Sequence, residues 1–121
     1  MKKVVLIADD SPTIRKFVAF SLTMQGLEVI SAVDGMEALE KIPEQRIDLL
    51  ITDLNMPNMD GFELIKAVRQ TEEYKDIPII ILSSLSSSEE IELGMSCGAN
   101  SYLVKPFDPK RIQYEVAKYL N

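Results

Sequence analysis

Five short apolar stretches, rich in β-branched residues, recur along the chain. They lie at residues 4–8, 27–32, 49–54, 77–82 and 101–104. Each stretch is nearly continuously apolar instead of alternating between apolar and polar positions. This pattern is typical of strands that are buried on both faces, as in a parallel sheet covered by helices. We therefore expect five strands of one parallel sheet.

The segments between these stretches have the apolar spacing and the capping residues of helices. Ser11 is a good N-cap and Pro12 a good first helical residue, and Gly26 is expected to end this first helix. Asp34 and Glu37 are expected to form a capping box at the start of the second helix. Strands and helices therefore alternate, which predicts an α/β fold with a doubly wound parallel sheet.

The third and fourth helices are indicated by an apolar stripe within residues 62–68 and by Ser86 with Glu89, which we expect to cap the fourth. Gly94 lies in the middle of this fourth helix, where glycine costs roughly 1 kcal/mol relative to alanine. Two explanations stay open. Either close packing leaves no room for a side chain, or the helix is kept marginally stable so that it can move.

The fifth helix is expected to begin at Asp108 and to bury Ile112. Tyr114 lies about 200° around this helix from Ile112. We therefore expect Tyr114 to be exposed beside Lys110 and Lys118, in a patch that suits a protein partner because tyrosine is enriched at binding hot spots.

Polar side chains stand where the expected strands end. Asp9 and Asp10 follow the first stretch, Asp53 lies near the end of the third, and Ser83 and Lys105 follow the fourth and fifth. Ligand sites of such sheets gather at the carboxyl ends of the strands. Three carboxylates beside an apolar interior repel each other and lose hydration, and one lysine cannot neutralise them. Mg²⁺ prefers oxygen ligands of this kind, so the sequence predicts a magnesium site.

Taken singly, each of these residues also has a structural explanation. Asp10 and Asp53 could cap helices, Ser83 could be a hydrogen-bonded loop hydroxyl, and Lys105 could be a surface charge. A carboxylate at position 53 follows a stretch expected to be buried on both faces, where an unpaired charge is costly. The structural explanations therefore fail when the residues are considered together.

Composition and charge exclude several other functions. Lys and Arg number 13 against 19 Asp and Glu, a net charge of -6, which argues against nucleic-acid binding. The chain has no histidine, so it has neither an imidazole-based triad nor a His-ligated zinc site, and its five glycines form no nucleotide-binding motif. A single cysteine, no signal peptide and no long apolar segment lead us to expect a cytoplasmic protein without a membrane partner.

Four motifs in this order resemble the receiver domain of two-component response regulators, and within it the stand-alone CheY-like type. They are ADDS at 8–11, TDLNMPNMDG at 52–61, the hydroxyl residue Ser83, and YLVKPF at 102–107. The resemblance covers essentially the whole chain. It implies one receiver domain over residues 1–121 and a flavodoxin-like (βα)5 fold with strand order 2-1-3-4-5.

The resemblance also implies the role of each residue at the strand ends. Asp53 would accept a phosphoryl group from a histidine kinase. Asp9, Asp10, Asp53 and the backbone carbonyl of Asn55 would hold Mg²⁺, while Ser83 and Lys105 would bind phosphoryl oxygens. The Lys105–Pro106 peptide bond is expected to be cis. The chain would assist its own phosphorylation and dephosphorylation without being an enzyme.

The signal would pass on through a change of surface. Tyr102 would turn inward after Ser83 and alter the surface made by the fourth helix, the fifth strand and the fifth helix, where a downstream protein binds. The chain would be a monomer or a phosphorylation-dependent dimer. The segment DDSPTIRK favours the chemotaxis branch of the family. Two positions depart from the common pattern of the family. Position 83 has serine where threonine is commoner, and position 85 has leucine where some relatives carry an acid or amide, so we expect the kinetics to differ from theirs.

Two alternatives remain. The first is a phosphorelay intermediate, or a receiver module of a larger regulator. The second is a Mg²⁺-dependent phosphatase, although such enzymes usually place their two acids as D-x-D after the first strand, whereas Asp9 and Asp10 are adjacent.

Overall fold

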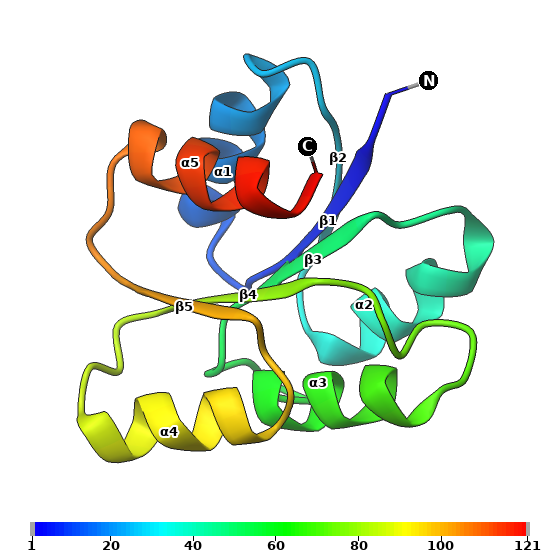
Figure 1. Cartoon of the computed structure of the whole chain (residues 1–121), viewed down its shortest axis with the longest axis vertical. Helices are drawn as coiled ribbons and strands as arrows, with labels where there is room; N and C mark the ends of the chain where they lie inside the picture. The colour runs from blue at the N-terminus through cyan, green and yellow to red at the C-terminus, as the bar shows by residue number, and fades with distance from the viewer. Residues whose placement is uncertain (1, 121) are drawn as a thin grey trace.

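The five expected strands and five expected helices are all present in the computed structural model, which describes residues 2–120 (Figure 1). The strands are β1 (Val4–Ala8), β2 (Glu28–Ala32), β3 (Leu49–Thr52), β4 (Ile79–Ser83) and β5 (Ser101–Val104). The α-helices are α1 (Pro12–Thr23), α2 (Gly35–Lys41), α3 (Gly61–Gln70), α4 (Ser88–Ser96) and α5 (Pro109–Leu120), and a short 3-10 helix spans Ile42–Glu44. Among these described residues, no helix is both long and apolar enough to cross a bilayer.

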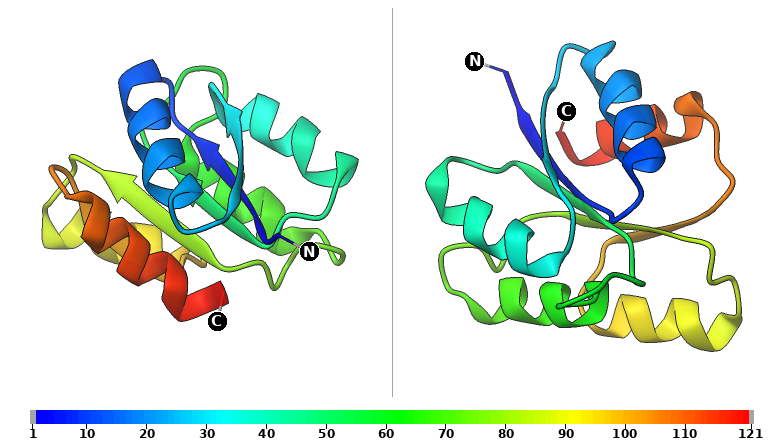
Figure 2. Two further views of the ribbon diagram at one scale, coloured as in Figure 1. Left: turned by 90° about the horizontal axis from the view of Figure 1, so that it is seen from above. Right: turned by 180° about the vertical axis from the view of Figure 1, so that it is seen from behind.

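The strands form one parallel sheet in the order β2-β1-β3-β4-β5, which confirms the expected fold. Helices α1 and α5 cover one face of the sheet, and α2, α3 and α4 cover the other (Figure 1), as the two further views in Figure 2 also show. All the strands run in one direction, so their carboxyl ends meet at one edge. This edge carries the polar residues that follow the strands.

Side chains of each central strand alternate between two hydrophobic cores. In β1, Leu6 belongs to the core beneath α2 and α3, whereas Val5 and Ile7 belong to the core beneath α1 and α5. In β3, Leu50 belongs to the core beneath α2 and α3, and Ile51 belongs to the core beneath α1 and α5. Because both faces are covered, both sets of positions must be apolar. This is the physical reason for the continuous apolar stretches in the sequence.

Two helix boundaries differ from the sequence prediction. Helix α1 ends at Thr23, three residues before Gly26, and Gly26 instead forms the following turn with a φ of 82°. Helix α4 is capped by Ser87, whose Oγ accepts from the backbone N–H of Glu90 at 3.2 Å. The expected cap at Ser86 with Glu89 is therefore wrong by one residue, because both serines have a glutamate three positions later and the local pattern cannot choose between them.

The capping box expected at α2 is present only in part. Asp34 Oδ1 accepts from the backbone N–H of Glu37 at 2.8 Å, as predicted. The Glu37 carboxylate, however, accepts from the backbone N–H of Val33 at 2.6 Å and not from that of Asp34. A capping box is completed instead at α3, between Asp60 and Glu63.

Gly94 is buried where α4 packs against the sheet. A Cβ atom at this position would lie 2.7 Å from Cδ1 of Ile81 and 3.3 Å from Cε2 of Tyr102. This geometry supports the close-packing explanation for the glycine. Movement of α4 on phosphorylation stays a prediction.

Gly94→Ala is expected to lower the free energy of unfolding by about 1 kcal/mol. Overpacking a core costs about 1–3 kcal/mol, while alanine returns about 1 kcal/mol of helix propensity. Urea denaturation measures the difference, and Glu92→Ala, at an exposed position of α4, is the control that should change stability by less than about 0.5 kcal/mol. A stabilised Gly94→Ala variant would contradict the packing explanation.

Candidate functional site

Three carboxylates meet at the carboxyl edge of the sheet, from Asp9 and Asp10 after β1 and Asp53 after β3. One carboxylate oxygen of each lies within 4.8 Å of the others. Asp9 is fully buried, Asp53 is 7% exposed, and Asp10 faces solvent. The structure therefore brings together the three acids that the sequence singled out.

Backbone hydrogen bonds fix these acids at the strand ends. The N–H of Asp53 donates to the carbonyl of Ala8 at 2.9 Å, and the N–H of Asp9 donates to the carbonyl of Ala32 at 3.1 Å. These bonds continue the sheet ladder one residue beyond the strands. The Asp53 carboxylate also accepts from the backbone N–H of Leu54 at 2.7 Å, so its direction is set by its own loop.

Lys105 supplies a counter-charge to the buried acids. Its Nζ lies 3.2 Å from Oδ2 of Asp9 and 3.4 Å from Oδ2 of Asp53, and its side chain is only 18% exposed. The Lys105–Pro106 bond is cis, as expected, and the Lys105 N–H donates to the carbonyl of Ser83 at 2.8 Å. One ammonium thus serves two buried carboxylates.

Because Lys105 is shared between Asp9 and Asp53, its charge does not fully compensate the Asp53 carboxylate. Burial raises the pKa of Asp53 above its ordinary value, the charge of Lys105 opposes that rise, and the charge of Asp9 adds to it. The metal-free site therefore disfavours the ionised acid. A divalent cation in contact with these oxygens would reverse this preference, and the all-oxygen donor set fits Mg²⁺.

Ser83 and Tyr102 meet at the loop that follows β4. Ser83 is buried, and its Oγ accepts from the backbone N–H of Leu85 at 3.1 Å. The Tyr102 hydroxyl donates to the carbonyl of the same Leu85 at 2.7 Å, and its ring faces Gly94 on α4. Tyr102 is thus half-buried in this structure, so the inward movement implied by the family resemblance stays a prediction.

Three residues to which the sequence analysis gave no individual role also shape the site. Arg15 Nη1 donates to the backbone carbonyl of Asp9 at 2.7 Å. Asn58 Nδ2 donates to Oδ2 of Asp34 at 2.7 Å, so Asp34 does more than cap α2. A Cβ on Gly61 would lie 2.1 Å from the backbone oxygen of Asp53, which leaves room for glycine alone. Asn58 and Gly61 lie within the motif at 52–61, which indicated the loop as a whole but not these contacts.

Asn55 lies exposed in the loop between Asp53 and α3. The proposed role of its backbone carbonyl as a metal ligand stays a prediction.

Known proteins share this architecture. Residues 5–117 match the family described as "Response regulator receiver domain". The sensor protein EvgS of Escherichia coli K12 is 48% identical over 102 residues, which make up 84% of this chain but only 8% of EvgS. The structure of the chemotaxis response regulator CheY4 of Vibrio cholerae is 42% identical, covers 99% of this chain and 100% of that chain, and has a TM-score of 0.93.

A second similar structure contains a metal ion. The receiver domain of a sensor histidine kinase of Pseudomonas aeruginosa is 26% identical, covers 98% of both chains and has a TM-score of 0.90. That protein has a magnesium ion coordinated in its active-site cleft.

Proposed function

The chain belongs to the family of response regulator receiver domains, which are phosphorylated by histidine kinases, and we propose that Asp53 is its phosphoacceptor. Such a domain is a signalling phospho-acceptor and not an enzyme in the usual sense. The observation that carries the proposal is the position of Lys105, whose Nζ contacts both Asp9 and Asp53 at the edge where the three acids meet.

Asp9, Asp10, Asp53 and the backbone carbonyl of Asn55 would hold Mg²⁺. The donor chemistry supports this, as does the magnesium ion in the Pseudomonas relative. When bound, the cation would neutralise charge on the acids and on the phosphodonor.

The chain's own residues would then hold the phosphoryl group. Lys105 would place its ammonium on one phosphoryl oxygen, since it already lies 3.4 Å from the Asp53 carboxylate. The Ser83 hydroxyl accepts a hydrogen bond from Leu85, which leaves its proton free to donate to a second phosphoryl oxygen. Ser83 and Tyr102 both hydrogen-bond to the backbone of Leu85. Movement of Ser83 would therefore shift Leu85 and strengthen or weaken its hydrogen bond with Tyr102.

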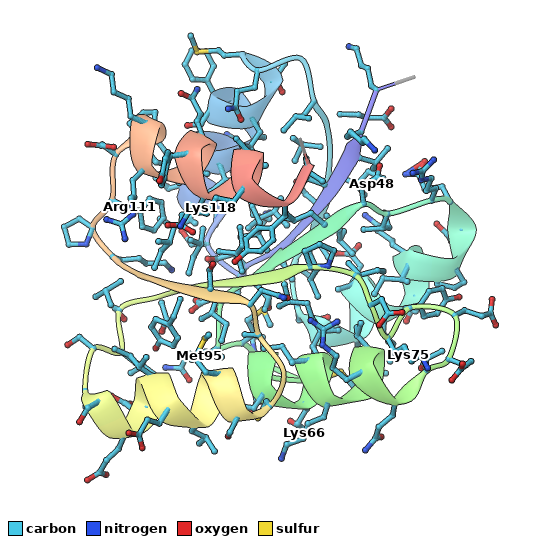
Figure 3. The ribbon with its side chains drawn as sticks, in the orientation of Figure 1. Asp48, Lys66, Lys75, Met95, Arg111 and Lys118 are labelled. Carbon is cyan, nitrogen blue, oxygen red and sulfur yellow. The ribbon has the colours of Figure 1, made fainter. Side chains whose placement is uncertain are left out.

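A downstream protein would bind to the surface formed by α4, β5 and α5. This surface carries the exposed apolar side chains of Leu93, Met95, Val104 and Tyr114. Tyr114 is 64% exposed, which confirms that prediction, and Lys118 Nζ lies 5.0 Å from the centroid of its ring. Figure 3 labels Met95 on α4 and Lys118 on α5. A hollow of about 620 Å³ between β5 and α5 offers a downstream protein a place to bind.

The pathway is proposed from the relatives. The likeness to CheY4 over nearly the whole chain supports a role in chemotaxis or motility. The likeness to part of EvgS favours a second candidate, a receiver that acts in a phosphorelay or in a larger regulator. Transfer of the phosphoryl group from Asp53 to a histidine phosphotransfer domain would favour the second candidate, and profiling against the histidine kinases of the host would identify the donor.

Labelling with acetyl phosphate tests the phosphoacceptor. The protein is expected to gain one phosphoryl group in the presence of Mg²⁺ and none in EDTA, as measured by intact mass. Peptide mapping after reduction of the acyl phosphate should place the group on Asp53. Equal labelling in EDTA, or a label on another residue, would refute the proposal.

Leu85→Gln is expected to speed loss of the phosphoryl group by up to about tenfold, a barrier change near 1.4 kcal/mol. By resemblance to receivers, the side chains at Asn55 and Leu85 flank the path of the attacking water. Leu85 can neither orient nor activate that water, whereas an amide can hydrogen-bond it. The decay of phosphorylated protein in excess Mg²⁺ measures the effect once the donor is removed.

Leu93→Gln is the matched control for this variant, since it makes the same change at an exposed position of α4. Its decay rate should equal that of the wild type. Unchanged or slower decay in Leu85→Gln, with Mg²⁺ affinity intact, would show that Leu85 does not control access of water.

A further inference from the structure

The carboxylate of Asp34 joins two loops that are distant in sequence. Its Oδ1 accepts from the backbone N–H of Glu37 at the start of α2, at 2.8 Å. Its Oδ2 accepts from Nδ2 of Asn58, in the loop between β3 and α3, at 2.7 Å. Asp34 is 6% exposed, and these bonds, from Glu37 first and Asn58 second, lower its pKa. It is therefore ionised at neutral pH and makes two charge-assisted hydrogen bonds.

The backbones of the same two loops are also in contact. The N–H of Gly35 donates to the carbonyl of Met59 at 3.1 Å. A Cβ on Gly35 would lie 2.6 Å from that carbonyl oxygen, so a larger residue would push the loops apart. The glycine is thus required by the close approach of the two backbones.

Asn58 adopts an unusual conformation at this contact. Its φ of 66° is the only positive value at a non-glycine position among residues 2–120. Asparagine tolerates this left-handed conformation better than most residues. Its side-chain amide then reaches Asp34, so the bend of the loop and the hydrogen bond between the loops depend on the same residue.

We propose that Asp34, Gly35, Asn58 and Met59 form a loop clamp that positions the segment after Asp53 for cation binding. The inference rests on the proposed function, because that segment carries Asn55. Asp34 and Asn58 act as positioning residues and need not touch the cation or the phosphoryl group. With the clamp in place, the segment is ordered before the cation arrives, so less conformational entropy is lost on binding.

The coupling between the loop clamp and cation binding is reciprocal. If the clamp strengthens cation binding, then Mg²⁺ must strengthen the clamp by the same factor. The amide of Gly35 reports on the clamp, since its N–H donates across to Met59. Its hydrogen exchange is therefore expected to slow when Mg²⁺ binds, although Gly35 lies at the start of α2 and not in the segment that carries Asn55.

Asn58→Gly is the sharpest test, because glycine adopts a positive φ without strain and leaves the cap of α2 intact. Isothermal titration with Mg²⁺ should show Kd raised by about three- to tenfold, somewhat less than the 10–100-fold typical of outer-shell partners. The Gly35 amide should exchange faster than in the wild type. Circular dichroism at the same temperature verifies that the variant is fully folded.

Exchanging the carboxylate of Asp34 with the amide of Asn58 distinguishes a positioning role of this pair from a simple loss of stability. Asn58→Asp places two carboxylates together and should also weaken Mg²⁺ binding. The double variant Asp34→Asn/Asn58→Asp restores a carboxylate–amide pair and should recover most of the affinity. Asp48→Ala is the control, since Asp48 Oδ2 accepts from the backbone N–H of Val4 at the opposite end of the sheet (Figure 3). Its Mg²⁺ affinity should not change.

The outcomes distinguish the two proposals. Wild-type Mg²⁺ affinity and wild-type Gly35 exchange in Asn58→Gly would overturn the loop clamp while leaving the function of Asp53 untouched. Failure of the double variant to recover affinity would also overturn it. Absence of Mg²⁺ binding and labelling in the wild type itself would overturn the proposed function, and the role of the clamp with it.

Discussion

Asp53→Asn is expected to abolish uptake of a phosphoryl group from acetyl phosphate and, at the same time, to raise the melting temperature of the metal-free protein. The first effect follows because an amide is not a nucleophile toward phosphorus under these conditions. The second follows because burial and the charge of Asp9 disfavour the ionised Asp53 carboxylate in the fold. Stabilising substitutions that improve the charge distribution commonly raise the free energy of unfolding by about 0.5–2 kcal/mol, or roughly 2–8 °C in melting temperature for a domain of this size.

Asp48→Asn is the matched control for stability, because Asp48 lies just before β3 and Asp53 just after it. Asp48 has favourable partners, the backbone N–H of Val4 at 2.8 Å and Nε of Arg46 at 2.9 Å. The control should melt no higher than the wild type and should label normally. Differential scanning calorimetry in EDTA and intact mass after labelling measure the two effects. Residual Mg²⁺-dependent labelling of Asp53→Asn would identify another acceptor.

Asp10→Asn should weaken Mg²⁺ binding by at least about tenfold and by up to about a hundredfold. Changes in outer-shell partners alone typically cost 10–100-fold, and the Asp10 carboxylate lies within 4.8 Å of the other two acids. Asp10 is exposed, whereas Asp9 is fully buried and paired with Lys105. Asp10→Asn therefore removes one proposed cation ligand with the least disturbance of the core.

Titration calorimetry at fixed ionic strength measures this change, since exposed charges are screened by salt. Asp76→Asn alters the net charge equally at an exposed position in the loop before β4 and should retain wild-type affinity. Labelling of Asp10→Asn should recover when the Mg²⁺ concentration is raised in proportion to its Kd. Equal affinity in Asp10→Asn and the wild type would exclude Asp10 from the metal site.

The strands and the acid cluster could be predicted because each depends on a short segment of sequence. Burial on both faces makes a strand such as residues 49–52 almost entirely apolar, and a charged residue directly after it is conspicuous. The direction shared by parallel strands then brings Asp9 and Asp53 to one edge. No knowledge of packing was needed for either step.

The loop clamp could not be predicted, because it depends on contacts between distant segments, and neither could the start of α4. Asp34 and Asn58 are 24 positions apart, and a helix cap explains Asp34 completely at the level of sequence. For α4, Ser86 and Ser87 satisfy the same local rule. The structure has Ser87 as the cap, and the local pattern alone does not distinguish the two serines.

The contact between Gly61 and the backbone of Asp53 has a consequence for genetics. Every missense change at codon 61 adds a Cβ atom, which would lie 2.1 Å from the backbone oxygen of Asp53, the proposed phosphoacceptor. A screen for signalling-deficient alleles should therefore find missense changes at this codon as readily as at the codons of the three acids, although glycine has no reactive side chain. Suppressors of such alleles should lie in the loop that joins β3 to α3, where a change in backbone conformation would make room for the added Cβ atom.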